Sequence, residues 1–473
     1  MTTPKSQNAS EEKTALLPAV QEPIVPAVRP ISDPRTVKKH KHGRNTALSK
    51  RLLRIARGWG NQGVPAKPVQ VTMTIPDLLG SLGLAMLQSQ LPTSDIERQL
   101  GDIARAYGRP DLRMVVLPTS ILVEDPAQAR TGVFPLLSGS YRLDQAGAME
   151  RLVARVVGEH PEPEEAIREI ARISQTPPRF SGRTMIVGHM ILTLGFGMVI
   201  NPTATALPAY LVLGALVGLV ITLMRGRASV QLLLPVATSF LLTLLTLVTL
   251  SDVLPDDPLL LVAPALLAFL PGHMLTVAAV ELTSNQVIAG ASRLVYGFAQ
   301  LGLLAFGVYA AWHVVDAPPV SGWAPLLGPW APWVGVVLTS VGFNLYMVAP
   351  KGALRWILFG NLVVYAAQFT GSVLVGPALS GFAGAMVLEP LARAIQRFRS
   401  APPTVVLRTS GYFLLVPGAL GFISVSEAAS TVGSLSMIVQ VFLSLMAIAL
   451  GTLVGASVSR EIRAAVRTWH DPV

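Results

Sequence analysis

The chain has 473 residues, of which 51% are hydrophobic and only 14% are charged, and its mean hydropathy is +0.53. These values are too apolar for a soluble globular protein, so most of the surface must face lipid. The net charge of +10 is concentrated in a tail and a few loops, and it does not indicate nucleic acid as a partner. Because the sequence has no cysteine, disulfides, thiol nucleophiles and thiolate metal sites are excluded.

The first segment of the chain, residues 1–70, is rich in proline, alanine and charge and has no periodic apolar pattern. We predict that it is a disordered basic N-terminal tail. Its basic run, Lys38 to Arg57, favours retention on the cytoplasmic side of a membrane, and contact with anionic lipid headgroups is the alternative. No aromatic platform is interleaved with these charges, so we do not expect nucleic-acid binding.

The next segment, residues 72–178, has the pattern of a small cytoplasmic α+β domain. Helical apolar spacing recurs in four stretches: Ile75–Gln88, Ser94–Gly108, Asp144–Val157 and Glu162–Ile173. Ser94 and Glu97 have the spacing of a capping box at the start of the second helix. The β-branched stretch Arg113–Asp125 predicts one or two strands.

The rest of the chain predicts a polytopic α-helical membrane protein of about ten transmembrane helices. The predicted spans are 184–201, 206–224, 230–250, 259–280, 287–311, 332–349, 356–375, 377–394, 404–424 and 435–457. They divide into a first five-helix unit at 184–311 and a second at 332–457, followed by a cytoplasmic C-terminal tail at 458–473. Alternate loops, at 202–205, 251–258, 312–331 and 425–434, contain no Lys or Arg. The positive-inside rule therefore places both termini in the cytoplasm.

A short pattern occurs twice within this apolar region, as FLPGHMLTVAAVE from Phe269 to Glu281 and as LVPGALGFISVSE from Leu415 to Glu427. The two copies are offset by 146 residues and fall in spans four and nine. Proline removes one backbone hydrogen bond from a membrane helix and loosens the next turn. Because each unit has an odd number of spans, the second unit is upside down relative to the first. The pattern thus predicts two inverted repeats, with a transport site at the two broken helices.

Both broken segments supply the candidate substrate-binding residues, which are Pro271, Gly272, His273, Pro417 and Gly418. Pro271 cannot donate to the carbonyl of Leu267, and a freed carbonyl can accept from an ammonium group. The N–H groups that open the next half-helix can bind a carboxylate. An amino-acid-like substrate suits this arrangement, and a simple proline kink that serves packing is the alternative.

Three charged residues are candidates for proton coupling or gating, namely Glu281, Arg293 and Glu427. Arg293 lies one or two turns into the span after Glu281, so the two side chains can pair within the membrane. Static pairing of spans four and five is the alternative for Glu281, and a solvated helix end is the alternative for Glu427. His273 could titrate near neutral pH or could hydrogen-bond as a neutral group between helices.

Further polar residues have simpler interpretations. Glu389 and Arg393 have the i,i+4 spacing of an ion pair at a helix end, which explains both without a function. The sequence shows no metal-ligand spacing, and we expect no metal and no cofactor.

Motifs along the chain include DLLGSLGLAMLQ, LPTSDIERQL, SYRLDQAGAMERLV, LPGHMLTVAAVELTSNQVIAGASRL and LVPGAL. In these motifs and in the order of its parts, the chain from about Ile75 onward resembles the threonine/serine exporter family. The resemblance implies a secondary exporter of threonine and serine in the plasma (inner) membrane, driven by the proton gradient. Expected partners are the amino acid, protons and the lipid bilayer, and a homo-oligomer is left open.

Two other classes of function compete with a transporter. An intramembrane enzyme is not expected, because the sequence has no HExxH, no cysteine and no credible Ser/His pair in facing spans. A membrane-embedded scaffold or sensor, with the cytoplasmic domain as the acting part, is the alternative. Two symmetric helix breaks weigh against it, since a scaffold does not need them.

Overall fold

In the computed structural model, Met1–Gln70 and Val71–Val473 are two separate units. The structure describes residues 73–136, 139–225, 233–251, 253–315, 324–376, 379–415 and 435–470, together with Ile423 and Ser426. The predicted tail at 1–70 and the motif residues Pro417, Gly418 and Glu427 lie outside the described residues.

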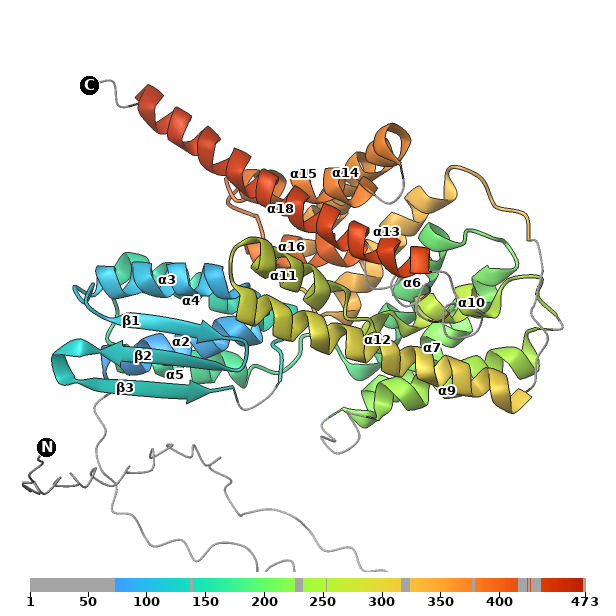
Figure 1. Cartoon of the computed structure of the whole chain (residues 1–473), viewed down its shortest axis with the longest axis horizontal. Coiled ribbons are helices and arrows are strands. Elements are labelled where there is room, and N and C mark those ends of the chain that lie inside the picture. The colour runs from blue at the N-terminus through green and yellow to red at the C-terminus, as the bar shows by residue number, and fades with distance from the viewer. Residues whose placement is uncertain are drawn as a thin grey trace, which may run out of the picture. The chain divides into compact units, whose positions relative to one another are not determined.

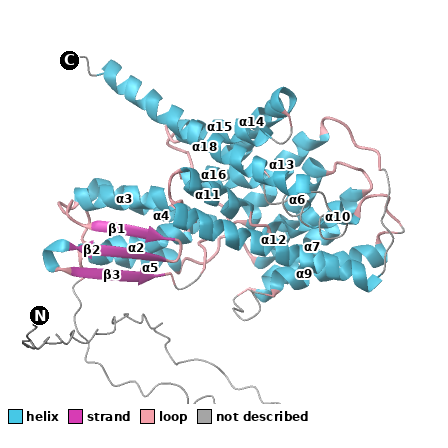
Figure 2. Cartoon of the chain, viewed as in Figure 1, coloured by secondary structure: helices cyan, strands magenta, loops and turns pink. Residues whose placement is uncertain are grey.

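The N-terminal domain combines helices with a three-stranded antiparallel sheet. Its elements are α2 (Ile75–Gln88), α3 (Thr93–Ala106), β1 (Arg113–Leu117), β2 (Ser120–Asp125), β3 (Arg130–Pro135), α4 (Leu143–Glu159) and α5 (Pro163–Ser174). The strand order is β1-β2-β3, and all three strands lie within this domain (Figure 2). Arg113–Asp125 contributes two strands, as the pattern allowed, whereas β3 is not predicted from the sequence.

This domain has a hydrophobic core of its own. Leu82 of α2, Leu100 of α3, Ile121 of β2 and Val156 of α4 are completely buried and belong to one cluster. Apolar residues one helical turn apart, or alternating along a strand, thus face the same interior. Helices and a small sheet thus occur together in this region, and the domain bounds at 72–178 stay a prediction.

The first two helices of the domain differ in how their N-termini are capped. Thr74 and Asp77 form a capping box at the start of α2. The capping box predicted from Ser94 and Glu97 is wrong, because α3 begins without a side-chain cap. Glu97 instead accepts a hydrogen bond from the backbone N–H of Val116, at 3.2 Å, and so joins α3 to β1.

The remaining helices follow the N-terminal domain along the chain (Figure 1). They are α6 (Gly182–Ile200), α7 (Ala206–Met224), α9 (Leu234–Thr249), α10 (Pro258–Ala265), the 3-10 turn η2 (Leu266–Phe269), α11 (Gly272–Thr283), α12 (Val287–Val315), α13 (Ala331–Tyr346), α14 (Ala353–Val375), α15 (Ser380–Ile395), α16 (Thr404–Leu414) and α18 (Leu435–His470). Each predicted span overlaps one of these helices, except span 259–280, which overlaps α10, η2 and α11. The predicted C-terminal tail at 458–473 continues α18 as far as His470.

By length and composition, five helices within the described residues can cross a membrane, and the bent pair formed by α10–η2 and α11 can make a sixth. The chain is therefore a helical membrane protein. α9 and α13 are apolar but shorter than a full span. The ten-span arrangement as two inverted repeats stays a prediction.

Helix contacts repeat between the two halves of the membrane part. α6 packs on α7, α7 on α10 and α9 on α12 in the first half. The corresponding pairs in the second half, α13 with α14, α14 with α16 and α15 with α18, also pack together. Across the halves, the most extensive contact joins α6 to α13.

Glycines make the contact between α6 and α13 reciprocal. A methyl group added at Gly195 would lie 2.7 Å from the carbonyl oxygen of Gly335, and one added at Gly342 would lie 2.8 Å from the carbonyl oxygen of Gly188. Gly188 corresponds to Gly335, and Gly195 to Gly342, within one residue of the 146-residue offset between the Pro-Gly motifs. The contact of Gly195 with Gly335 is thus repeated by their counterparts, Gly342 and Gly188, as a two-fold axis between the two halves requires.

Loops without Lys or Arg gather at one end of the bundle. Asp256 accepts hydrogen bonds from Asn201 Nδ2, at 3.1 Å, and from Thr203 Oγ1, at 2.6 Å. Thr203 also forms a β-bridge with Leu326. Three of the four loops without Lys or Arg therefore meet, as the alternation of Lys and Arg among the loops predicts.

Candidate functional site

The first Pro-Gly motif breaks its helix, as the sequence predicts. η2 ends at Phe269, α11 begins at Gly272, and the two helical segments meet at an angle of 67°. Proline has no N–H to donate and its ring displaces the preceding turn, so the regular hydrogen-bond ladder stops here.

The carbonyl groups at the break are partly satisfied from within the protein. The carbonyl of Leu267, expected to be free, accepts the N–H of Leu270 at 3.3 Å, because the chain tightens into a 3-10 turn before the proline. The carbonyl of Phe269 accepts from Gln300 Nε2 of α12 at 2.9 Å. A polar side chain from the next span therefore supports the break, as buried backbone groups require.

A cavity of about 760 Å³ opens at this break. Four of the predicted site residues line it, namely Pro271, Gly272, His273 and Arg293. Polar groups from other elements also reach it, including Ser292 and Gln300 of α12 and Thr409 of α16. An apolar cavity with a few convergent polar groups is the usual form of a small-molecule site.

Glu281 lies at the far end of α11 and is fully buried. Its Oε2 atom lies 3.4 Å from Arg293 Nε, so the predicted ion pair between spans four and five is present. Its Oε1 atom accepts the backbone N–H of Thr93, at 2.9 Å, where α3 begins. This glutamate therefore joins the broken helix to both α12 and the N-terminal domain, and it is not a solvated helix end.

His273 lies one residue past the break, and its ring makes an edge contact with Tyr412, with 5.9 Å between the ring centroids. Its Nδ1 atom is buried and has no hydrogen-bond partner among the described residues. His189, by contrast, is fully buried, and its Nδ1 atom lies 2.9 Å from the carbonyl of Gly214. The Nε2 atom of His189 is also without a partner among the described residues, but His189 does not line the cavity at the helix break, whereas His273 does.

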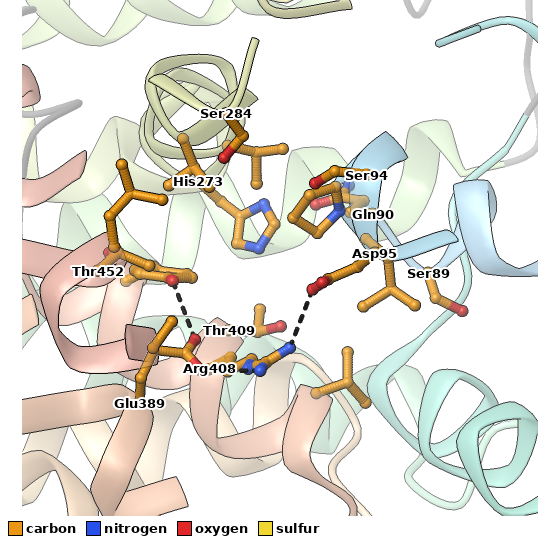
Figure 3. Close-up of a pocket in the computed structure, with 18 of the residues that line it drawn as sticks. Ser89, Gln90, Ser94, Asp95, His273, Ser284, Glu389, Arg408, Thr409 and Thr452 are labelled. Atoms are coloured by element: carbon orange, nitrogen blue, oxygen red, sulfur yellow. Dashed lines mark hydrogen bonds and ion pairs between the residues drawn. The ribbon is translucent and has the colours of Figure 1, made fainter. Parts of the chain in front are cut away.

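A second cavity, of about 300 Å³, lies where the start of α3 meets α11, α15, α16 and α18 (Figure 3). Gln90, His273, Thr409 and Tyr412 line both this cavity and the larger one. The two spaces thus adjoin along these side chains. Together they run from the helix break to the N-terminal domain.

An ion network crosses the second cavity, and sequence reasoning missed its central residue. Arg408 Nη2 lies 2.7 Å from Glu389 Oε2, and Arg408 Nη1 lies 3.5 Å from Asp95 Oδ2 of the N-terminal domain. The predicted pair of Glu389 and Arg393 is present at 3.8 Å, but it is the weaker contact of this glutamate. The available signal was an arginine inside an apolar span, which marks a functional or paired position by default.

Among the described residues, no group of three or more His, Cys, Asp or Glu side chains is placed to hold a metal ion. The polar side chains that line both cavities carry guanidinium, hydroxyl, imidazole and amide groups, and the smaller cavity also has carboxylates. Such a set can recognise a small zwitterion through ion pairs and hydrogen bonds.

Comparison with known proteins bears on the part of the chain that holds the break. Residues 77–315 match a family model described as "Putative threonine/serine exporter". No curated protein and no solved structure matches the chain significantly. The matched residues run from α2 to α12 and include Pro271, Glu281 and Arg293, whereas Glu389 and Arg408 lie beyond them.

Proposed function

Because the chain belongs to the threonine/serine exporter family, we propose that it exports threonine and serine across the plasma membrane as a secondary transporter. The family model covers about half of the chain, including the N-terminal domain and the broken helix. The chemistry of a transporter is binding and release, so the protein is not an enzyme in the usual sense.

The cavity at the helix break is the observation that carries this proposal. We place the substrate beside Pro271, Gly272 and His273, where the cavity of about 760 Å³ has room for a small amino acid. The N–H groups at the start of α11 suit the carboxylate of the substrate. In the proposal, Pro417 and Gly418 of the second motif complete the site from the other repeat.

Alternating access between two inverted five-helix repeats is the proposed mechanism. The matching helix pairs in the two halves and the reciprocal glycine contacts between α6 and α13 support it. In such a mechanism one unit rocks against the other around the fixed site near the midplane. The proton gradient would drive the cycle.

Glu281 and Arg293 are the proposed coupling pair, with Glu427 as a counterpart in the second repeat. Their burial supports this role, because a paired charge inside a membrane is a functional candidate. Protonation of Glu281 would remove the negative charge that holds Arg293, and so loosen α11 from α12, while the neutral carboxyl group could still accept the N–H of Thr93. We propose cytoplasmic N- and C-termini, in accord with the loops that lack Lys and Arg at one end of the bundle.

Efflux from proteoliposomes tests the proposal. Labelled threonine or serine is loaded inside, and its release is followed with and without an imposed proton gradient. We expect the wild-type protein to release both amino acids faster with the gradient. The Glu281→Gln variant, which cannot carry the proton, should lose that acceleration.

The matched control is Glu159→Gln, which changes an exposed glutamate at the end of α4 and should behave as the wild type does. Gradient-dependent efflux that persists in Glu281→Gln would make this residue structural while keeping the exporter. Release of neither threonine nor serine by the wild-type protein would overturn the proposed function.

A further inference from the structure

The smaller cavity, where the N-terminal domain meets the membrane helices, has the composition of an anion receptor. Three arginines and two carboxylates line it: Arg98, Arg393, Arg408, Asp95 and Glu389. One positive charge is therefore in excess. Its volume of about 300 Å³ is at the lower end of the range for small-molecule sites.

Arg393 and Arg408 both line this cavity from the membrane helices, and Arg408 is the one that also contacts the N-terminal domain (Figure 3). Glu389 holds its Nη2 atom at 2.7 Å. The contact of its Nη1 atom with Asp95 is longer, at 3.5 Å, and its buried Nε atom has no hydrogen-bond partner within the described residues. A guanidinium group has five N–H donors, so Arg408 retains donors for another carboxylate.

Asp95 reaches this arginine from α3, across the boundary between the domain and the membrane helices (Figure 3). Its other carboxylate oxygen lies 2.5 Å from Arg98, whose side chain is 55% exposed. The aspartate can therefore leave Arg408 without becoming an unpaired buried charge, since a solvated partner on its own helix remains. Its contact with Arg408 is the replaceable one.

A group on the same wall as Arg408, the Glu389 carboxylate, suits an ammonium group. Glu389 Oε1 accepts a hydrogen bond from Tyr412, which is long at 3.4 Å. A carboxylate oxygen with so weak a contact can accept from a further donor. A carboxylate receptor and an ammonium acceptor thus lie on one side of the space that Asp95 enters.

We propose that this cavity is a receiving site for an α-amino acid on the side of the N-terminal domain. Arg408 binds the α-carboxylate, Glu389 accepts from the ammonium, and Asp95 occupies Arg408 until the substrate displaces it. The domain is then a gate that the substrate opens by competition, and His273 and Tyr412 lie between this site and the helix break. The substrate class rests on the proposed function.

Binding of threonine and of threoninol, the amino alcohol that lacks the carboxylate, tests this site. Dissociation constants are measured on the full chain in detergent for the wild type and for Asp95→Asn. Removing the competing carboxylate should tighten threonine binding roughly two- to fivefold, the range of a partly exposed ion pair. Threoninol has no group that competes for Arg408, so its dissociation constant should not change.

Asp102→Asn is the matched control, because Asp102 lies on the same helix, is exposed and pairs with Arg105. It should leave both dissociation constants at their wild-type values. If Asp95→Asn leaves threonine binding unchanged or weaker while wild-type efflux of threonine is intact, the receiving site is overturned and the exporter stands. If the wild-type protein neither binds nor exports threonine or serine, the proposed function falls and this site with it.

Discussion

Glu281 and Arg293 are a buried ion pair whose structural contribution can be measured apart from transport. Replacing Glu281 by Gln leaves the Arg293 guanidinium without its counter-charge, at a side chain only 12% exposed. Removing one partner of a buried pair costs about 3 kcal/mol, most of it from the charge left behind. We therefore expect Glu281→Gln and Arg293→Gln, each made alone, to lower the melting temperature of the protein in detergent.

The double variant, Glu281→Gln with Arg293→Gln, separates pairing from other roles of the two side chains. If the pair is the main interaction, the double variant should be more stable than the sum of the single effects predicts. Additive losses would show that each residue is held by other contacts. For Glu281 the remaining contact is the N–H of Thr93, which a Gln side chain can still accept.

At the residue scale, the sequence predicts interactions that arise from spacing along one or two neighbouring helices. The Glu281–Arg293 pair follows from the short turn between two spans, and the Glu389–Arg393 pair from one helical turn. Arg408 pairs with Asp95, more than 300 positions away, so no local pattern reveals this contact. Such a partner becomes visible only when the domain is docked.

At the element scale, the helix break was predictable because its cause is local. Pro271 stops the hydrogen-bond ladder wherever it occurs within a helix. β3 was not predictable, because Arg130–Pro135 contains Gly132 and ends in proline, and both residues disfavour a strand. The strand forms because β2 offers a full row of partners, from Ser120 to Asp125.

The packing of α6 on α13 depends on glycines that a methyl group would block. A methyl group at Gly342 would lie 2.3 Å from the backbone nitrogen of Leu192, which cannot move without shifting α6. We expect Gly342→Ala to lower the free energy of unfolding by about 2 kcal/mol, the usual cost of overpacking. The purified protein is heated, and the fraction that stays folded at each temperature is measured by size-exclusion chromatography. The decrease in melting temperature reports the loss of stability.

Gly302→Ala is the control for this substitution. Gly302 lies within α12 and has nothing within 4 Å of an added methyl group. Alanine should therefore be neutral there or stabilise the helix by up to about 1 kcal/mol. Equal melting temperatures for the two variants would contradict a close approach of α6 and α13.

At the scale of the whole molecule, the N-terminal domain is held to the membrane helices by hydrogen bonds at helix ends. The Glu150 carboxylate accepts from the N–H groups of Thr404, at 2.7 Å, and Val405, at 2.8 Å, and thus caps the start of α16. The N–H of Leu143 at the start of α4 donates to the carbonyl of Met347, at 3.2 Å, where α13 ends. The sequence predicts the N-terminal domain and the membrane helices. It does not predict how they dock, because the docking contacts join residues that are far apart in the chain.

This docking predicts that the domain stays bound after the chain is cut. A protease site inserted between Pro178 and Arg179 separates the domain from α6 without altering the contacts of Glu150 or Asp95. The cleaved wild-type protein should elute as one complex in about 0.1 M salt. Raising the salt to about 1 M shortens the Debye length from about 10 to 3 Å and should release part of the domain, because the Arg408–Asp95 docking contact is a partly exposed ion pair.

Glu150→Gln should shift this balance toward release. It removes the charge that caps α16, and a charged hydrogen-bond acceptor contributes about 1.5–3 kcal/mol. The cut variant should therefore lose its domain at a salt concentration at which the wild type retains it, as measured by size-exclusion chromatography. Glu159→Gln, on the same helix but exposed, should elute as the wild type does. If cleaved Glu150→Gln also kept its domain in high salt, apolar contacts rather than the helix cap would hold the domain. Competition by the substrate for Arg408 alone would then be too weak to move the domain away from the membrane helices.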